Sequence, residues 1–298
     1  MKKSIWFIIN PIAGIRRKDD IPSLVLKHLD HNQFDFEIQY TKYKGHAKEI
    51  AKEALEKNIQ IVCAVGGDGS VHEIGTCLIG SKIVLAVLPI GSGNGLARHF
   101  NIPLSIKKAI YCINEGNAIS MDTVLVNDQA FIGISGFGFD ALVAEKFVGS
   151  TKRGFRTYAK IVLRELFRYK PITISVEINE QERTLPVMLC TVTNITQWGN
   201  GLLVSPHSNA TDGKIELVLM KPFSFWRIPW IALFFLVGRP DKCSFIEIIP
   251  FEKATLENAQ TLAHYDGESK ESKSTLNVKV VPKSLHIFVG KLINKRWN

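Results

Sequence analysis

Four short apolar segments alternate with segments of helical spacing in the first third of the chain. This alternation constrains the fold more than any other feature of the sequence. The apolar segments have the composition of β-strands and cover residues 4–10, 34–40, 61–65 and 84–89. The segments with helical spacing cover residues 23–29, 47–58 and 70–78. Because strands that alternate with helices form parallel sheets, we predict an α/β domain here.

The rest of the chain is rich in strand-like segments and poor in helical ones. The strand-like segments cover residues 172–178, 187–193, 214–220, 244–249, 275–281 and 285–289. This pattern is typical of an antiparallel β-sandwich. The change falls near the turn signal Asn127-Asp128. We therefore predict an α/β plus all-β chain with domains at residues 1–125 and 126–290, the extreme C-terminal residues returning to the first domain.

The balance of charges favours anionic partners. The chain has 37 lysines and arginines against 28 aspartates and glutamates, a formal charge of +9, which suits nucleotides, nucleic acid or an acidic membrane surface. No RNP-like, zinc-finger or helix-turn-helix signature is present, so we expect no specific nucleic-acid partner. The five cysteines are scattered and never spaced as CxxC, which indicates reduced thiols in a cytoplasmic protein.

Two apolar segments raise the question of membrane contact. Residues 1–9 have the basic and then apolar order of a secretory signal, but Asn10-Pro11 ends the run, and we expect a first buried strand instead. Residues 223–238 fall short of the roughly 20 residues that span a bilayer, although they could lie on one. A helical segment at residues 157–169 carries a basic stripe spaced by four residues, formed by Arg156, Lys160, Arg164 and Arg168.

The stripe and the aromatic segment together favour peripheral attachment to the inner face of an anionic membrane. The alternative is that the stripe is a solvated helix face and that the aromatic side chains pack in the second core.

The sharpest motif is Gly66-Gly67-Asp68-Gly69-Ser70, directly after a predicted strand and before a helical segment. Glycines let the backbone approach an anion, and a helix N-terminus offers N–H groups to it. The motif is neither a P-loop nor a dinucleotide fingerprint, and the alternative is an ordinary tight turn. A second glycine-rich turn, residues 89–95, follows the next strand, and loops beginning at Asn10 and Thr41 follow the first two. The four loops are expected to share the carboxyl edge of the sheet, where ligands bind.

The ordered combination of motifs resembles the diacylglycerol kinase catalytic-domain family, which includes soluble bacterial diacylglycerol kinases and sphingosine kinases. The motifs are Asn10-Pro11, Thr41 with Gly45-His46-Ala47, residues 66–70 and 91–94, and Asp266-Gly267-Glu268. The resemblance implies an NAD kinase- and phosphofructokinase-like nucleotide-binding domain followed by a lipid-binding β-sandwich. It also implies an ATP-dependent lipid kinase that uses Mg²⁺, with diacylglycerol as the leading acceptor and phosphatidic acid as the product.

The resemblance also assigns site residues. Contacts with ATP are implied for Asn10, Thr41, Gly66, Gly67, Asp68, Gly69, Ser70, Val71, His72 and Ser92. Asp68 is implied to help hold the catalytic Mg²⁺. A structural Mg²⁺ is implied at Asn209, Asp212 and Lys214, where a lysine can contribute only its carbonyl oxygen. The alternative for these last residues is a plain turn before a strand.

Glu268 matches the general base of the family. A lipid hydroxyl must lose its proton as it attacks the γ-phosphorus, and a carboxylate can take that proton. The alternative is a solvated hairpin, because Asp-Gly is a strong turn dipeptide.

Departures from the family pattern leave the substrates open. Ser70, His72 and Ser92 stand where the family commonly has threonine, asparagine and threonine, and His72 changes what its loop can donate. The turn at residues 91–95 is closer to that of sphingosine kinases, so a sphingoid base or another lipid is an alternative acceptor. Further alternatives are an NAD kinase and a non-catalytic protein that binds nucleotide or membrane. The expected partners are ATP, the lipid acceptor and an anionic membrane surface, and a second copy of the chain is also considered.

Overall fold

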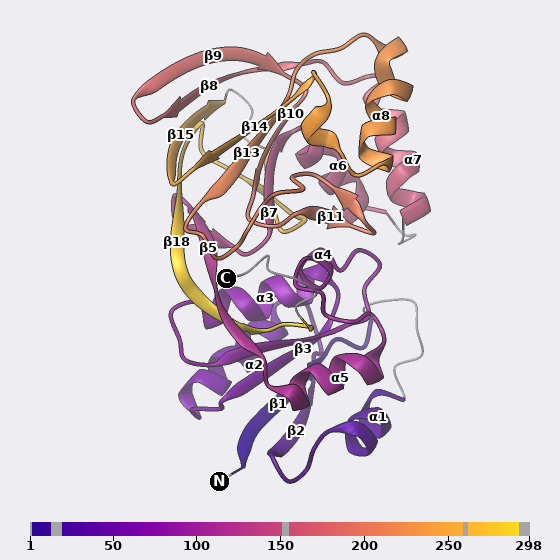
Figure 1. The fold of residues 1–298 in the computed structure, drawn as a ribbon, viewed down its shortest axis with the longest axis vertical. Helices are drawn as coiled ribbons and strands as arrows, with labels where there is room; N and C mark the ends of the chain where they lie inside the picture. Colours follow the sequence, from indigo (N-terminus) through magenta and orange to yellow (C-terminus); the bar gives the residue numbers. More distant parts are fainter. Residues whose placement is uncertain (1, 13–19, 151–154, 259–261, 292–298) are drawn as a thin grey trace. The chain divides into compact units, whose positions relative to one another are not determined.

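The computed structural model describes residues 2–12, 20–150, 155–258 and 262–291, which form two compact units (Figure 1). Unit 1 contains the residues up to Met121 and those from Lys283, and unit 2 contains residues 122–282. The division lies four residues before the predicted boundary, inside strand β5 (Ala118–Val126), which continues from one unit into the other. The return to unit 1 starts inside strand β18 (Thr275–Phe288), before the extreme C-terminal residues.

Unit 1 has the predicted α/β architecture. Its elements in chain order are β1 (Lys3–Ile9), α1 (Ile21–His28), β2 (Phe34–Tyr40), α2 (His46–Glu56), β3 (Ile61–Gly66), α3 (Asp68–Leu78), β4 (Val84–Pro89), α4 (Gly95–His99) and α5 (Ile106–Glu115). The strands follow the order β2-β1-β3-β4-β18, and each neighbouring pair is parallel. Helices α4 and α5 were not among the elements predicted from the sequence.

Burial explains why the first segment forms a strand. β1 pairs with β2 on one side and β3 on the other, and Ile5, Phe7 and Ile9 are inaccessible to solvent. Strands of parallel sheets are apolar on both faces because helices cover each face. Helix α2 shows the matching pattern, since its alanines and Ile50 are buried while its lysines are exposed.

Unit 2 is the predicted antiparallel sandwich. One sheet contains the first half of β18 with β15 (Lys253–Asn258), β8 (Ile172–Ile178) and β9 (Gln181–Val187), while β5 pairs with β6 (Gln129–Phe131). The other follows the order β14 (Ile246–Phe251), β13 (Ile215–Met220), β10 (Leu189–Thr193), β7 (Ile134–Gly138), β16 (Leu262–Tyr265) and β17 (Glu268–Glu271). Both sheets contribute to one core, which includes Val176 and Leu256 from the first and Phe137 and Leu217 from the second.

Two strand predictions for unit 2 need correction. The segments predicted as separate strands at residues 275–281 and 285–289 are one strand, β18. Its pairing with β15 ends at Lys279 and its pairing with β4 begins at His286. Pro282 lies between these stretches, so its missing N–H removes no bond from either ladder. Conversely, residues 187–193 divide between β9 and β10, with Met188 between the two strands.

Helices cover part of unit 2. They are α6 (Phe139–Val148), α7 (Phe155–Leu166) and α8 (Ile228–Leu236), with the short helical turns η1 (Phe225–Arg227) and η2 (Pro240–Lys242) and the small hairpin β11 (Gln197–Gly199) and β12 (Leu202–Leu203). Helix α7 ends three residues before the predicted end, so Arg168 of the basic stripe lies in the turn that follows. Within the described ranges, no helix is long and apolar enough to cross a bilayer.

Candidate active site

The carboxyl ends of β1 and β3 meet where the strand order of unit 1 reverses. The chain moves from β1 to β2 on one side and then crosses to β3 on the other, and ligands of open parallel sheets bind at such a point. The main-chain N–H of Asn10, just after β1, donates to the Val65 oxygen at 3.2 Å. The Asn10 side-chain amide donates to the Ser70 hydroxyl at 3.4 Å. The structure thus brings together the first and third of the four predicted loops.

Asp68 joins the two glycine-rich loops. Its Oδ2 atom accepts the main-chain N–H of Asn94 at 2.9 Å, and its Oδ1 atom accepts that of Gly95 at 2.7 Å. Hydrogen bonds to a carboxylate are stronger than those between neutral groups. The Asn94 backbone is left-handed (φ 52°), and its side-chain amide donates to the Gly91 oxygen at 2.8 Å. The loop after β4 is therefore folded onto the loop after β3.

Close approach explains two of the glycines. A Cβ atom on Gly91 would lie 2.5 Å from the Gly67 Cα atom, and one on Gly66 would lie 2.3 Å from the Ser70 hydroxyl oxygen. By contrast, a Cβ atom on Gly69 would meet nothing within 4 Å. Gly66 and Gly91 are thus required by the packing of the loops, and Gly69 leaves open space beside the start of α3.

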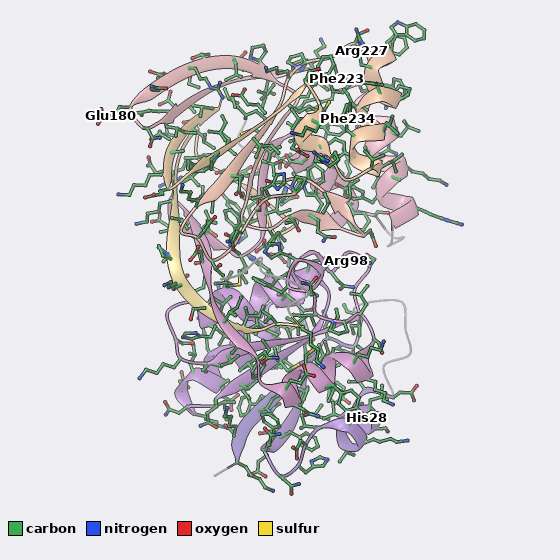
Figure 2. All side chains as sticks on the ribbon, viewed as in Figure 1. His28, Arg98, Glu180, Phe223, Arg227 and Phe234 are labelled. Atoms are coloured by element: carbon green, nitrogen blue, oxygen red, sulfur yellow. The ribbon has the colours of Figure 1, made fainter. Side chains whose placement is uncertain are left out.

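The start of α3 can bind an anion. The cap residue is Gly67, which has no side chain to cap the helix, and the first N–H groups and the positive end of the helix dipole favour negative charge. Arg98 lies on α4 (Figure 2), and its Nε donates to the Gly93 oxygen at 3.1 Å. A guanidinium beside this loop suits a phosphate. The sequence analysis missed Arg98, whose signal is a basic residue one turn into the helix after a glycine-rich loop.

The remaining residues assigned to ATP lie at the same edge of the sheet or beside it. The buried Thr41 follows β2, and its main-chain N–H donates to the Ile9 oxygen at 2.9 Å. Val71 and His72 are buried residues of α3, and Ser92 is half-buried in the second glycine-rich loop. The burial of Val71 and His72 makes them part of the support of the loop.

Glu268 is the first residue of β17, in unit 2. It is half-buried and directly opposite Tyr265 of β16. Asp266 and Gly267 join the two strands with positive φ angles of 50° and 87°, as a two-residue hairpin requires. The structure therefore contains the hairpin considered above, and Glu268 is the first residue of its second strand.

Asp266 anchors this hairpin to residues 132–134, where β7 begins. Its carboxylate accepts the main-chain N–H groups of Ile132, Gly133 and Ile134 at 2.9, 2.7 and 2.9 Å. Three bonds to one carboxylate fix both its position and that of the turn. The two acids of the Asp-Gly-Glu motif thus occupy different environments.

The Asp212 turn is held by its own polar groups. Asp212 Oδ1 accepts the Lys214 N–H at 3.0 Å, and the Asp212 N–H donates to the Asn209 oxygen at 3.4 Å. The next N–H, that of Gly213, donates to Oδ2 of the fully buried Asp122 at 2.8 Å. The structure therefore brings Asn209, Asp212 and Lys214 into one turn, as predicted for a turn before a strand.

The surroundings of this turn are acidic. Burial, and then the charge of Asp212, raise the pKa of Glu216 from 4.5 to about 7, although the Ser208 hydroxyl donates a hydrogen bond to it. The carboxylate of Asp212 is exposed and its neighbours in the turn offer carbonyl oxygens, the type of ligand that Mg²⁺ takes. The residues present therefore fit a magnesium ion in chemistry and in charge. In the described part of the chain, no three His, Cys, Asp or Glu side chains cluster as a metal site.

Two family models together match most of the chain. The diacylglycerol kinase catalytic domain matches residues 4–126. The YegS C-terminal NAD kinase beta sandwich-like domain matches residues 133–289, more than half of the chain.

Individual proteins show the same likeness. A protein of Chromohalobacter salexigens named "Probable lipid kinase YegS-like" is 28% identical over 78% of this chain and 76% of its own length. A diacylglycerol kinase of Bacillus subtilis is 28% identical over 78% of this chain and 79% of its own. A crystal structure of a diacylglycerol kinase from Bacillus anthracis covers 98% of each chain with a TM-score of 0.77 and 17% identity, a likeness of fold.

Gly91→Ala tests the packing of the two loops. The added methyl group would clash with the Gly67 backbone, so we expect a loss of about 1–3 kcal/mol of stability, as overpacking typically costs. Urea denaturation measures the loss, and Gly69→Ala is the control because its methyl group meets open space. Equal stability of the two variants would contradict the close approach.

Glu216→Gln tests the acidic turn through its pH dependence. Because the folded pKa of Glu216 is raised to about 7, its contribution to stability is fully present below about pH 4.5. That contribution is lost as the pH rises through about 7. The variant cannot ionise here, so its gain in melting temperature over the parent should grow from about pH 4 to about pH 8. The exposed Glu257→Gln is the control, and a gain that stays constant with pH would contradict the assignment.

Proposed function

Because the chain belongs to the lipid-kinase family that joins a diacylglycerol kinase catalytic domain to a YegS-type β-sandwich, we propose that it phosphorylates diacylglycerol with ATP. The product is phosphatidic acid, and a sphingoid base or another lipid alcohol is the alternative acceptor. The observation that carries the proposal is the pair of glycine-rich loops held together by Asp68 at the reversal of the strand order.

The nucleotide phosphates are proposed to lie against the start of α3. The N–H groups there and the Arg98 guanidinium offset phosphate charge, and Asn10, Thr41, residues 66–72 and Ser92 form the edge that receives ATP. The loop after β4 is kept in place by the bonds of its backbone to Asp68. The binding energy of ATP therefore depends on an arrangement of the two glycine-rich loops that is formed before ATP binds.

Asp68 is also proposed to help hold the magnesium ion that accompanies ATP. The Asp68 carboxylate accepts the N–H groups of Asn94 and Gly95, and carboxylate oxygens are ligands that Mg²⁺ takes. When bound, Mg²⁺ neutralises part of the phosphate charge. The position of Asp68 in the first turn of α3 fits this role.

Glu268 is proposed as the general base. The lipid hydroxyl oxygen forms a bond to the γ-phosphorus, the bond from that phosphorus to the bridging oxygen of ADP breaks, and the hydroxyl proton passes to the Glu268 carboxylate. Glu268 is half-buried, and the hairpin that carries it is fixed by the three bonds to Asp266. A fixed base loses little freedom in the reaction.

The Asp212 turn is proposed to bind a second, structural Mg²⁺ through Asp212 and the carbonyl oxygens of Asn209 and Lys214. A cation there would favour the ionised form of Glu216, whose pKa is raised partly by Asp212. Added millimolar Mg²⁺ should therefore narrow the difference in melting temperature between the parent and Glu216→Gln at about pH 8.

The lipid-kinase activity is tested by label transfer from γ-labelled ATP with Mg²⁺. The acceptors are diacylglycerol, a sphingoid base, ceramide, phosphatidylglycerol and NAD, in separate reactions. We expect labelled phosphatidic acid and loss of turnover in Glu268→Gln, which should keep its affinity for ATP because the glycine-rich loops are unchanged. Label in another lipid would revise the acceptor, label in NAD alone would contradict the lipid-kinase function, and a fully active Glu268→Gln would exclude Glu268 as the base.

The acceptor lies in a membrane, and we propose that η1 and α8 reach that membrane. Their side chains include exposed apolar groups, namely Phe225, Trp226, Trp230, Leu233 and Leu236, and Trp226 is 77% exposed. Helix α8 is attached to unit 2 by the buried Ile231 and by the Phe235 ring, which lies 5.8 Å from the Trp198 ring. A contiguous apolar surface of this kind is typical of an interaction site.

Basic residues lie in the same segment as these apolar groups. Lys221 and Arg227 are exposed at the start of this segment. The basic residues of α7 are also exposed, although Arg164 forms an ion pair with its neighbour Glu165 at 2.8 Å. Tryptophan beside arginine and lysine suits the interface of an anionic bilayer.

Replacing Trp226 and Trp230 together by serine tests this attachment. We expect weaker sedimentation with vesicles that contain phosphatidylglycerol, and lower activity on diacylglycerol in those vesicles. Activity on diacylglycerol in detergent micelles should be retained, because the site is unchanged. Tyr111→Ser, at an exposed aromatic residue of unit 1, is the control, and unchanged vesicle binding of the double variant would contradict the proposal.

A further inference from the structure

A buried acid and a buried histidine form a pair in unit 2 that none of the roles above uses. Asp140, at the start of α6, is 6% exposed, and His264, on β16, is 5% exposed. His264 Nε2 lies 3.4 Å from Asp140 Oδ2. A carboxylate and an imidazole are seldom buried unless partners satisfy them.

The partners of Asp140 show that its carboxylate has a prepared position. The Thr191 hydroxyl donates to Oδ2, and the Ala141 N–H donates to Oδ1 at 2.9 Å. Gly136 of β7 provides the room, because a Cβ atom there would coincide with the carboxylate. Burial and the charge of Asp140 raise the pKa of the neighbouring Cys190, which keeps that thiol neutral. The carboxylate is thus fixed before it meets His264.

The second ring nitrogen of His264 faces the hairpin of Glu268. The Gly267 N–H lies 3.3 Å from His264 Nδ1. Because a main-chain N–H can only donate, Nδ1 must accept, and the ring proton is then on Nε2, where it points to Asp140. A ring with protons on both nitrogens would place two donors face to face at Nδ1. The two contacts therefore select the tautomer of the imidazole that carries its proton on Nε2.

The bond to Gly267 acts one residue away from Glu268. The turn is held at Asp266 by three N–H groups of residues 132–134, and at Gly267 by His264. Helix α6, which carries Asp140, also contacts both β16 and β17. The Asp266 carboxylate and the Gly267 N–H thus both have fixed partners, and they orient the first residue of β17.

We propose that Asp140 and His264 are positioning residues that aim the Glu268 carboxylate. Asp140 sets the tautomer and rotation of the imidazole, and the imidazole holds the N–H of Gly267, the residue before Glu268. The proposal rests on the role of Glu268 as the base. Loss of the contact displaces the base in the reaction step and leaves the glycine-rich loops of unit 1 unchanged, so it lowers kcat and not the affinity for ATP.

The test compares His264→Phe with His264→Asn in the full chain, with kinetics on diacylglycerol in mixed micelles. Phenylalanine fills the space without an acceptor, whereas the asparagine oxygen can still accept the Gly267 N–H. We expect His264→Phe to lower kcat roughly 10- to 100-fold, the size of effect that a misplaced group has. Its KM for ATP should stay within about twofold of the parent. His264→Asn should recover most of the rate, and the exposed His207→Phe should behave as the parent.

Asp140→Asn is a second test of the positioning role, because it keeps the size of the side chain and removes the charge that orients the His264 ring. We expect a loss of kcat in the same direction as that of His264→Phe, and circular dichroism and thermal melting identify any variant that fails to fold. Full kcat in a folded His264→Phe, or equal loss in the asparagine and phenylalanine variants, overturns the positioning role. Turnover by Glu268→Gln would instead overturn the base on which the proposal rests, so the two failures are distinguishable.

Discussion

The carboxylate of Asp68 is the interaction on which the candidate nucleotide site depends. It stands in the first turn of α3 and binds two successive N–H groups of the loop after β4. Without that tie, two glycine-rich loops would follow neighbouring strands with little to order them, since glycine contributes flexibility and no side chain. Asp68 thus orders the two glycine-rich loops into one surface. This surface lies where the sheet topology favours a ligand.

Much of the fold could be predicted because periodicity reports burial directly. The apolar segments at residues 34–40, 84–89 and 172–178 coincide with β2, β4 and β8, and both domain architectures followed from the alternation or succession of such segments. The glycine motifs could be placed at strand ends for the same reason. What the spacing could not show is that Gly91 and Gly67 touch each other, because this contact depends on the lateral order of β3 and β4.

The features that were not predicted from the sequence have a common physical cause. Each depends on partners that lie far away along the chain. Two separate strands were predicted on either side of Pro282, but β18 passes through this residue where its pairing moves from β15 to β4. The short helix α4 follows a left-handed Asn94 that Asp68 and Gly91 stabilise, and no local pattern encodes those partners. Likewise the Asp140–His264 pair joins residues 124 positions apart in the chain, so only the folded sandwich brings the two side chains together.

The two acids of Asp266-Gly267-Glu268 have different roles. The Asp266 carboxylate accepts three main-chain N–H groups, so this acid is well suited to hold the turn. Glu268 stands two residues later, opposite Tyr265 of β16 and directly after Gly267, whose N–H is held by His264. The hairpin and the base are therefore not competing interpretations of the motif. Because the hairpin is rigid, the Glu268 carboxylate at the start of its second strand has a defined position for proton transfer.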